Sequence, residues 1–151
     1  NTLDVVEIDP GVTDLAKKYF ALEDHPNLTI HHEDARVFLN QNTKKFDAIF
    51  GDAFTSWYSV PYQLTTQEAI QKQYDSLSDN GVVILNIISA IEGEMGELLR
   101  AEYKTFKTVF PQVYILPVSS PKDGTQIQNI VLIALKSKTP PSWESQDREL
   151  T

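Results

Sequence analysis

The sequence predicts an α/β fold of the Rossmann-like type, in which strands and helices alternate around a mostly parallel sheet. Short runs rich in Val and Ile alternate with longer amphipathic stretches, which is the pattern of βαβ units. Hydrophobic residues make up 41% of the 151 residues, as in an ordinary globular core. We expect one domain over residues 1–137 and a flexible tail over 138–151, where Pro, Ser and charged residues predominate.

The first half of the chain predicts two strands, each followed by a helix. A strand is expected over Leu3–Ile8, and Pro10 ends it because proline cannot donate to a ladder. A strand over Leu28–His32 leads into a short helix that ends at Leu39. Between them, a helix over Thr13–Leu22 has an apolar face with members at three- and four-residue intervals, namely Val12, Leu15, Ala16, Tyr19 and Phe20.

The middle of the chain predicts a buried strand and a capped helix. Phe46–Phe50 is almost continuously apolar, which is typical of a strand buried on both faces. A helix begins at Thr65–Thr66, where the first threonine and Glu68 have the spacing of a capping box. This helix runs to about Leu77, and Asp79–Gly81 closes it as a turn.

The last elements are a strand, a long helix and two further strands. The apolar run Val82–Ile88 predicts another buried strand, and Glu92–Phe110 predicts a helix that Pro111 stops. Val113–Val118 and Ile127–Leu135 are expected as two strands joined by a polar loop, in a hairpin.

Composition excludes several classes of function. Thirteen basic and twenty-one acidic residues give a net charge of -8, so we expect no nucleic-acid partner and no direct membrane contact, whereas a cationic small molecule such as a polyamine would be attracted. The absence of cysteine excludes disulfides, thiolate metal sites and cysteine nucleophiles. No apolar run is long enough for a membrane span and no signal-peptide pattern opens the chain, so we expect a cytoplasmic location. No metal is expected, because His31 and His32 should point to opposite faces of a strand.

Acidic residues follow three successive predicted strands: Glu7 with Asp9, then Asp34, then Asp52. Open α/β sheets bind ligands at the carboxyl ends of their strands. One carboxylate there can accept both hydroxyls of a ribose, and a second can accept the exocyclic amine of adenine. Glu7 fits the first role and Asp34 the second. The alternative is that these acids cap helices or remain solvated.

Four motifs resemble the spermidine synthase family, the aminopropyltransferases that use decarboxylated S-adenosylmethionine. They are Val6–Pro10, Glu33–Leu39, Phe46–Phe54 and Val60–Glu68. The similarity in order and spacing runs from about Leu3 to Leu135, and small-molecule methyltransferases share the motifs in looser form. The resemblance implies an S-adenosylmethionine-dependent methyltransferase fold, a transferase activity in polyamine biosynthesis, and S-adenosylmethionine or its decarboxylated form as cofactor.

The resemblance also implies roles for individual residues. Glu7, with Asp9 beside it, would hold the ribose of the cofactor. The adenine would contact Asp34 and Ala35, between pocket walls formed by Pro61 and Leu64. Asp52 would be the catalytic carboxylate, close to both the cofactor and the reacting amine. In the aromatic cluster after it, Tyr58 and Tyr62 are candidates for contact with the acceptor, or they cover the core as a loop lid.

Three departures from the family pattern keep other functions open. The family's second aspartate is replaced by Thr55, and the loop Pro117–Pro121 lacks the expected aromatic residue. The absent second aspartate, with the shared fold, is the reason to consider a small-molecule methyltransferase. The altered amine pocket, with the missing glycine-rich loop, is the reason to consider a domain that kept the fold without the activity. The chain also begins at Asn1 without the glycine-rich loop and strand that the family places ahead of Glu7.

The strand ahead of Glu7 would lie between the Glu7 strand and the Asp52 strand. We therefore expect two unpaired sheet edges, either in a part of a longer polypeptide or in an assembly where another segment fills the gap. This chain alone should show little or no catalysis. The intact protein is expected to act on a small amine or other acceptor and to form a homo-oligomer.

Overall fold

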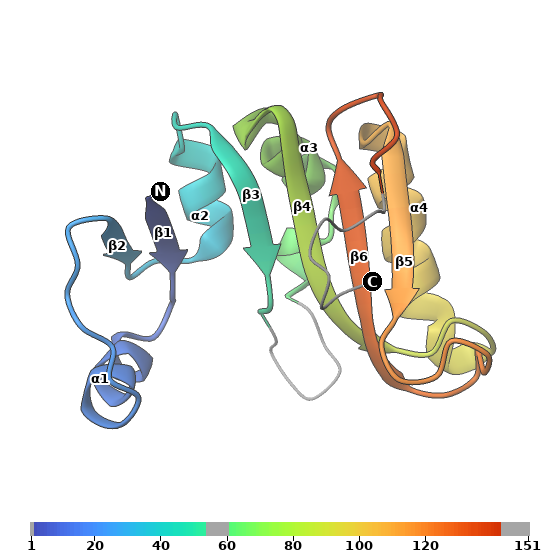
Figure 1. The fold of residues 1–151 in the computed structure, drawn as a ribbon, viewed down its shortest axis with the longest axis horizontal. Helices are drawn as coiled ribbons and strands as arrows, with labels where there is room; N and C mark the ends of the chain where they lie inside the picture. Colours follow the sequence, from blue (N-terminus) through green and yellow to red (C-terminus); the bar gives the residue numbers. More distant parts are fainter. Residues whose placement is uncertain (1, 54–60, 143–151) are drawn as a thin grey trace.

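The computed structural model describes residues 2–53 and 61–142 of the chain. Its strands form two sheets, one made of β1 and β2 and one with the order β3-β4-β6-β5 (Figure 1). The strands are β1 (Leu3–Val6), β2 (Leu28–His31), β3 (Phe46–Gly51), β4 (Leu77–Ser89), β5 (Gln112–Pro117) and β6 (Gln128–Leu135). The helices are α1 (Pro10–Tyr19), α2 (Ala35–Gln41), η1 (Tyr62–Leu64), α3 (Gln67–Ser76), η2 (Glu94–Gly96) and α4 (Glu97–Val109).

The α/β class is as predicted, whereas the mostly parallel sheet is only partly so. β1 pairs with β2 and β3 with β4 in parallel, but β6 runs antiparallel to both β4 and β5. The antiparallel pairing arises because the polar loop after β5 turns the chain straight back into β6. This is the predicted hairpin, and it makes the larger sheet mixed.

The predicted break in the sheet lies between β1 and β3. Within the described part of the chain, β1 pairs only with β2, and β3 pairs only with β4. Figure 1 shows β1 and β3 running in the same direction on either side of this break. Side chains around α2 connect the two sheets: the Phe38 ring lies 4.9 Å from that of His31 and 6.4 Å from that of Phe46. Lys44 Nζ also lies 2.7 Å from Asp4 Oδ1.

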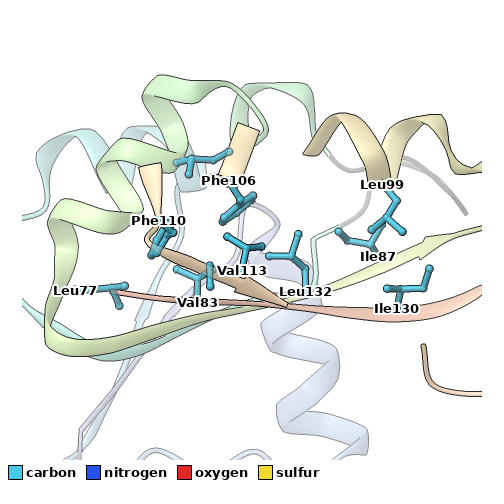
Figure 2. Close-up of a cluster of buried hydrophobic side chains, with 11 residues drawn as sticks. Leu77, Val83, Ile87, Leu99, Phe106, Phe110, Val113, Ile130 and Leu132 are labelled. Carbon is cyan, nitrogen blue, oxygen red and sulfur yellow. The ribbon is translucent and has the colours of Figure 1, made fainter. Parts of the chain in front are cut away.

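The hydrophobic core lies between the larger sheet and the helices α3 and α4 (Figure 2). Burying a side chain of the size of Leu or Phe contributes about 1.5 to 3 kcal/mol. The core therefore fixes β4 and, through it, the carboxyl end of β3. Its largest fully buried members are Phe106, Phe110, Ile70, Leu77, Ile87, Leu99, Ile130, Leu132 and Val83.

One burial prediction is wrong, and a further apolar surface is exposed. β3 was expected to be buried on both faces, but Phe50 is 73% exposed, while Ile49 on the opposite face packs against the core. The apolar face of α1 is also exposed: Leu15 is 54% and Phe20 81% accessible. The physical reason is that α3 and α4 pack on the Ile49 side of the sheet, and α1 lies beyond the end of β1 (Figure 1).

Helix starts differ from the predicted ones for local chemical reasons. Pro10 was expected to end a strand and instead begins α1, which Asp9 caps. Proline is well tolerated there because the N–H of the first helical residue has no partner within the helix. The cap of α3 is Thr66 rather than Thr65, because the Thr66 hydroxyl accepts from the N–H of Ala69. The carboxylate of Glu68 bonds its own N–H and the Thr66 hydroxyl, and both bonds lower its pKa.

Two other boundaries were misplaced. Asp79–Gly81 forms part of β4 rather than a turn, and the pairing register shifts there, from Phe46 opposite Leu77 to Ala48 opposite Val82. The predicted helix from Glu92 begins as η2 and continues as α4.

Across the described residues, no helix is long and apolar enough to cross a membrane. After β6, Gln112 Nε2 donates to the carbonyl oxygens of Ser137 and Thr139.

Candidate functional site

The acidic residues after β1 and β2 lie at the same end of the small sheet. The two strands are parallel, with Val6 opposite His31, and the N–H of Glu7 donates to the carbonyl of His31 over 3.0 Å. Glu7 therefore continues the pairing beyond β1, and Asp34 follows β2 in the loop that begins α2. Both side chains are half-buried. The predicted order of acids at strand ends is thus present in this sheet.

Each carboxylate at these strand ends has one oxygen committed to the local backbone. Glu7 Oε1 accepts from the N–H of Asp9 at 2.9 Å, and Asp9 Oδ1 accepts from the N–H of Gly11 at 2.8 Å. Asp34 Oδ1 accepts from the N–H groups of Arg36 and Val37 at 2.7 and 3.2 Å. These bonds fix the directions of the side chains. The capping role that the sequence left as an alternative is therefore real for Asp9 and Asp34.

The second oxygen of Asp34 faces the segment before α3. Gln63 Nε2 donates to Asp34 Oδ2 over 3.3 Å. Arg36, in the first turn of α2, donates from Nη1 to the carbonyl of Gln63 at 3.3 Å and to the hydroxyl of Thr66 at 3.2 Å. The half-buried Pro61 and Leu64 flank Gln63. The structure thus joins Asp34 to Gln63, which lies in the chain between Pro61 and Leu64, the predicted walls of an adenine pocket. Ala35 is next to Asp34, as the first residue of α2.

Asp52 lies at the carboxyl end of β3, on the larger sheet. Gly51, the last residue of β3, pairs with Leu85 of β4. One residue further along each chain segment, Asn86 Nδ2 donates to Asp52 Oδ1 over 2.9 Å. Asp52 is exposed to solvent. Among the described residues no hydrogen bond joins Asp52 to Glu7 or Asp34, which stand on the other side of the break between β1 and β3.

Of the two tyrosine candidates, the structure describes Tyr62. Tyr62 begins η1 and its side chain is 81% exposed. Tyr58, like the Thr55 position, lies outside the described residues. Their roles stay predictions.

The two adjacent histidines have separate structural partners. His31 Nε2 lies 2.8 Å from Asp4 Oδ1, and His32 Nε2 lies 3.0 Å from the Thr13 hydroxyl. They point to different neighbours, as the alternation along the strand predicted. Over the described ranges, no group of three or more His, Asp or Glu side chains could hold a metal ion.

Sequence reasoning missed three polar residues of this site: Arg36, Gln63 and Asn86. Asn86 could have been found, because it is an amide in the middle of the apolar run Val82–Ile88. Gln63 and Arg36 lie inside the recognised motifs, but their contacts join residues 27 and 30 positions apart. A sequence pattern does not show that residues so far apart along the chain are in contact.

The model of the spermine/spermidine synthase domain matches residues 1–142. The chain belongs to this family. A polyamine aminopropyltransferase from Vibrio vulnificus is 34% identical over 115 residues, which are 74% of this chain and 36% of that protein. An N-terminal histidine N-methyltransferase from Emericella nidulans is 32% identical over 143 residues, which are 91% of this chain and 25% of that protein. The matched part of this chain thus spans about a third or less of the length of these two relatives.

Solved structures share the fold. A probable spermidine synthase from Corynebacterium glutamicum superposes with a TM-score of 0.75 at 23% identity, covering 97% of this chain and 50% of that one. Human methyltransferase-like protein 13, in complex with SAH, gives 0.71 at 23% identity, covering 99% and 66%. A spermidine synthase in complex with the transition state analogue AdoDATO gives 0.72 at 21% identity, covering 91% and 47%. These neighbours establish a fold of the S-adenosylmethionine-dependent methyltransferase type.

Proposed function

We propose that this domain binds the adenosyl part of decarboxylated S-adenosylmethionine and serves in the transfer of an aminopropyl group to an amine. The observation that carries the proposal is the ordered set of carboxylates at strand ends, each oriented through one oxygen. Family membership and the relative from Vibrio vulnificus support the same reaction class. A neighbour in complex with AdoDATO and another with SAH support an adenosyl ligand.

The donor set fits a nucleoside. Glu7 would accept the two ribose hydroxyls, since only its Oε1 is engaged by the backbone. Asp34 would accept the exocyclic amine of adenine through Oδ2, between Pro61 and Leu64. The sulfonium of the cofactor would supply a carbon that is already activated toward a nucleophile. Asp9 caps α1 with Oδ1, so its contribution would be limited to positioning the loop after Glu7.

Asp52 would act on the acceptor amine. An ammonium group must lose a proton before its nitrogen can attack carbon. The amide of Asn86 holds Asp52 Oδ1, which leaves Oδ2 to accept that proton. The new C–N bond forms as the C–S bond breaks, and the electron pair of the broken bond goes to sulfur, giving a neutral thioether. The carboxylate also attracts a cationic acceptor, in keeping with the net charge of -8.

A second candidate is methyl transfer to a nitrogen. The histidine N-methyltransferase aligns with 91% of this chain, and Thr55 replaces the second aspartate of the aminopropyltransferase pattern. The products distinguish the two reactions, because aminopropyl transfer releases methylthioadenosine and methyl transfer releases S-adenosylhomocysteine.

The test is product analysis with the full-length gene product that carries this domain, supplied with each cofactor and a set of diamines. We expect methylthioadenosine from the decarboxylated cofactor, and a loss of turnover of about a hundredfold or more in Asp52→Asn. The matched control is Asp79→Asn, an exposed acid of β4, which should retain full activity. Formation of S-adenosylhomocysteine alone would replace aminopropyl transfer by methyl transfer, and unchanged turnover in Asp52→Asn would remove the catalytic role of Asp52.

A further inference from the structure

Three hydrogen bonds among four residues join two segments that are far apart in the sequence. Gln63 Nε2 bonds Asp34 Oδ2, and Arg36 Nη1 bonds the backbone of Gln63 and the hydroxyl of Thr66. All three contacts are partly buried. Gln63 is therefore held beside Asp34 at two points: its side-chain amide donates to Asp34, and its backbone carbonyl accepts from Arg36.

The two oxygens of Asp34 are not equivalent. Oδ1 is occupied by the N–H groups of Arg36 and Val37. Oδ2 accepts only from Gln63 within the described residues, and a carboxylate oxygen can accept a second hydrogen bond. The amide nitrogen of Gln63 likewise carries two hydrogens and uses one on Asp34. At this point the domain thus presents an acceptor next to a donor, 3.3 Å apart.

This pair matches one edge of adenine. Adenine has an amino group at position 6 beside an acceptor ring nitrogen, and a glutamine amide is a known partner for that edge. Hypoxanthine has an oxygen at position 6, which would face the carboxylate of Asp34 with an acceptor against an acceptor. Its N1 also carries a hydrogen, which would face the amide of Gln63 with a donor against a donor. Uncompensated polar groups of this kind are the strongest source of discrimination between similar ligands.

We propose that Gln63 is a specificity-determining residue: with Asp34 it reads position 6 of the purine, Asp34 Oδ2 accepting from the amine and Gln63 Nε2 donating to the neighbouring ring nitrogen. The inference rests on the proposed function, because it assumes that an adenosyl ligand binds at the end of β2. Arg36 is a positioning residue in this scheme. It touches no ligand and holds the backbone that carries Gln63.

The experiment compares methylthioadenosine with methylthioinosine, which has an oxygen in place of the 6-amino group and a hydrogen on the neighbouring N1. Calorimetric titration into the full-length gene product should give at least about tenfold tighter binding of the adenosine compound. Gln63→Leu should reduce that ratio about tenfold, and so should Gln63→Met, a second variant that preserves the side-chain length. Gln67→Leu, an exposed glutamine at the start of α3, should leave the ratio unchanged.

The outcomes separate the two proposals. If the wild-type protein binds neither nucleoside, the proposed function falls and this inference falls with it. If it binds methylthioadenosine but does not discriminate, or if both Gln63 variants keep the wild-type ratio, the assignment of Gln63 is wrong while adenosyl binding stands.

Discussion

At the scale of the residue, the acids at the strand ends serve the fold and the candidate site with different oxygens. Glu7, Asp34 and Asp52 each give one oxygen to a neighbouring backbone or amide group. Capping and ligand binding are therefore not competing explanations for the same carboxylate. A capped carboxylate has a fixed direction, which reduces the entropy that a ligand contact would otherwise cost.

The cap of α3 provides a test at this scale. Thr66→Ala should lower the free energy of unfolding by about 1 kcal/mol, because the N–H of Ala69 loses its acceptor. Thr65→Ala is the matched control. Among the residues that the structure describes, its hydroxyl bonds only the carbonyl of Tyr62, and the change should stay within about 0.5 kcal/mol. Urea unfolding of the two variants measures the difference, and equal losses would contradict the assignment of Thr66 as the cap.

Glu102 provides a second test. It is 3% exposed in α4, and burial raises its pKa from 4.5 to about 7. Between these values the folded state keeps a proton that the unfolded chain releases, so stability falls as pH rises through this window. Above the window the penalty is about 3 kcal/mol.

Removing the charge of Glu102 should remove this pH dependence. From pH 5 to pH 8 the free energy of unfolding of the wild type should fall by about 2 kcal/mol or more relative to Glu102→Gln. Glu97→Gln, an exposed position on the same helix, serves as control and should behave as the wild type does. Parallel curves for the wild type and Glu102→Gln would show that Glu102 does not hold the proton.

At the scale of the element, α2 is the part that joins the site together. Its first turn carries Arg36, which bonds the segment before α3, and its middle carries Phe38, which contacts rings of both sheets. Displacing α2 would therefore separate Asp34 from Gln63 and also loosen the link between the small sheet and β3.

Arg36→Ala tests this role of α2. We expect faster amide hydrogen exchange in residues 61–66, where Arg36 loses its bonds to the Gln63 carbonyl and the Thr66 hydroxyl. Exchange in the core strands β4 and β6 should not change. Arg100→Ala is a suitable control, because Arg100 similarly bonds backbone carbonyls, of Ile91 and Gly93, but at α4. Unchanged exchange in residues 61–66 would mean that Arg36 does not hold this segment.

The sequence predicted most elements because periodicity and turn residues are local signals. It failed where the decisive contact was elsewhere. Asp79–Gly81 has the composition of a turn, but it lies within β4 where the pairing with β3 shifts register. Pro10 is a different case, because the Asp9 cap beside it is itself a local signal of a helix start. The exposure of Phe50 could not be predicted either, because an apolar strand does not reveal which of its faces is covered.

At the scale of the whole molecule, the candidate site lies on both sides of the break in the sheet. Glu7 and Asp34 follow the strands of the β1–β2 sheet, and Asp52 follows β3 of the larger one. Figure 1 shows the two sheets on either side of the break. The sequence predicted both the acids and the break, the acids because each follows a strand and the break because the resemblance implies a strand between β1 and β3. The distance between the two halves depends on how the sheets are held together, which no local pattern specifies.

The central claim is that carboxylates at the ends of β1 and β2 hold an adenosyl ligand. Calorimetric titration of methylthioadenosine into the full-length gene product tests it most directly, with Glu7→Gln, Asp34→Asn and the exposed control Asp14→Asn compared with the wild type. We predict that the wild type and Asp14→Asn bind equally, and that the first two variants bind at least about tenfold more weakly. Absence of binding by the wild type, or equal affinity in all four proteins, would contradict the claim.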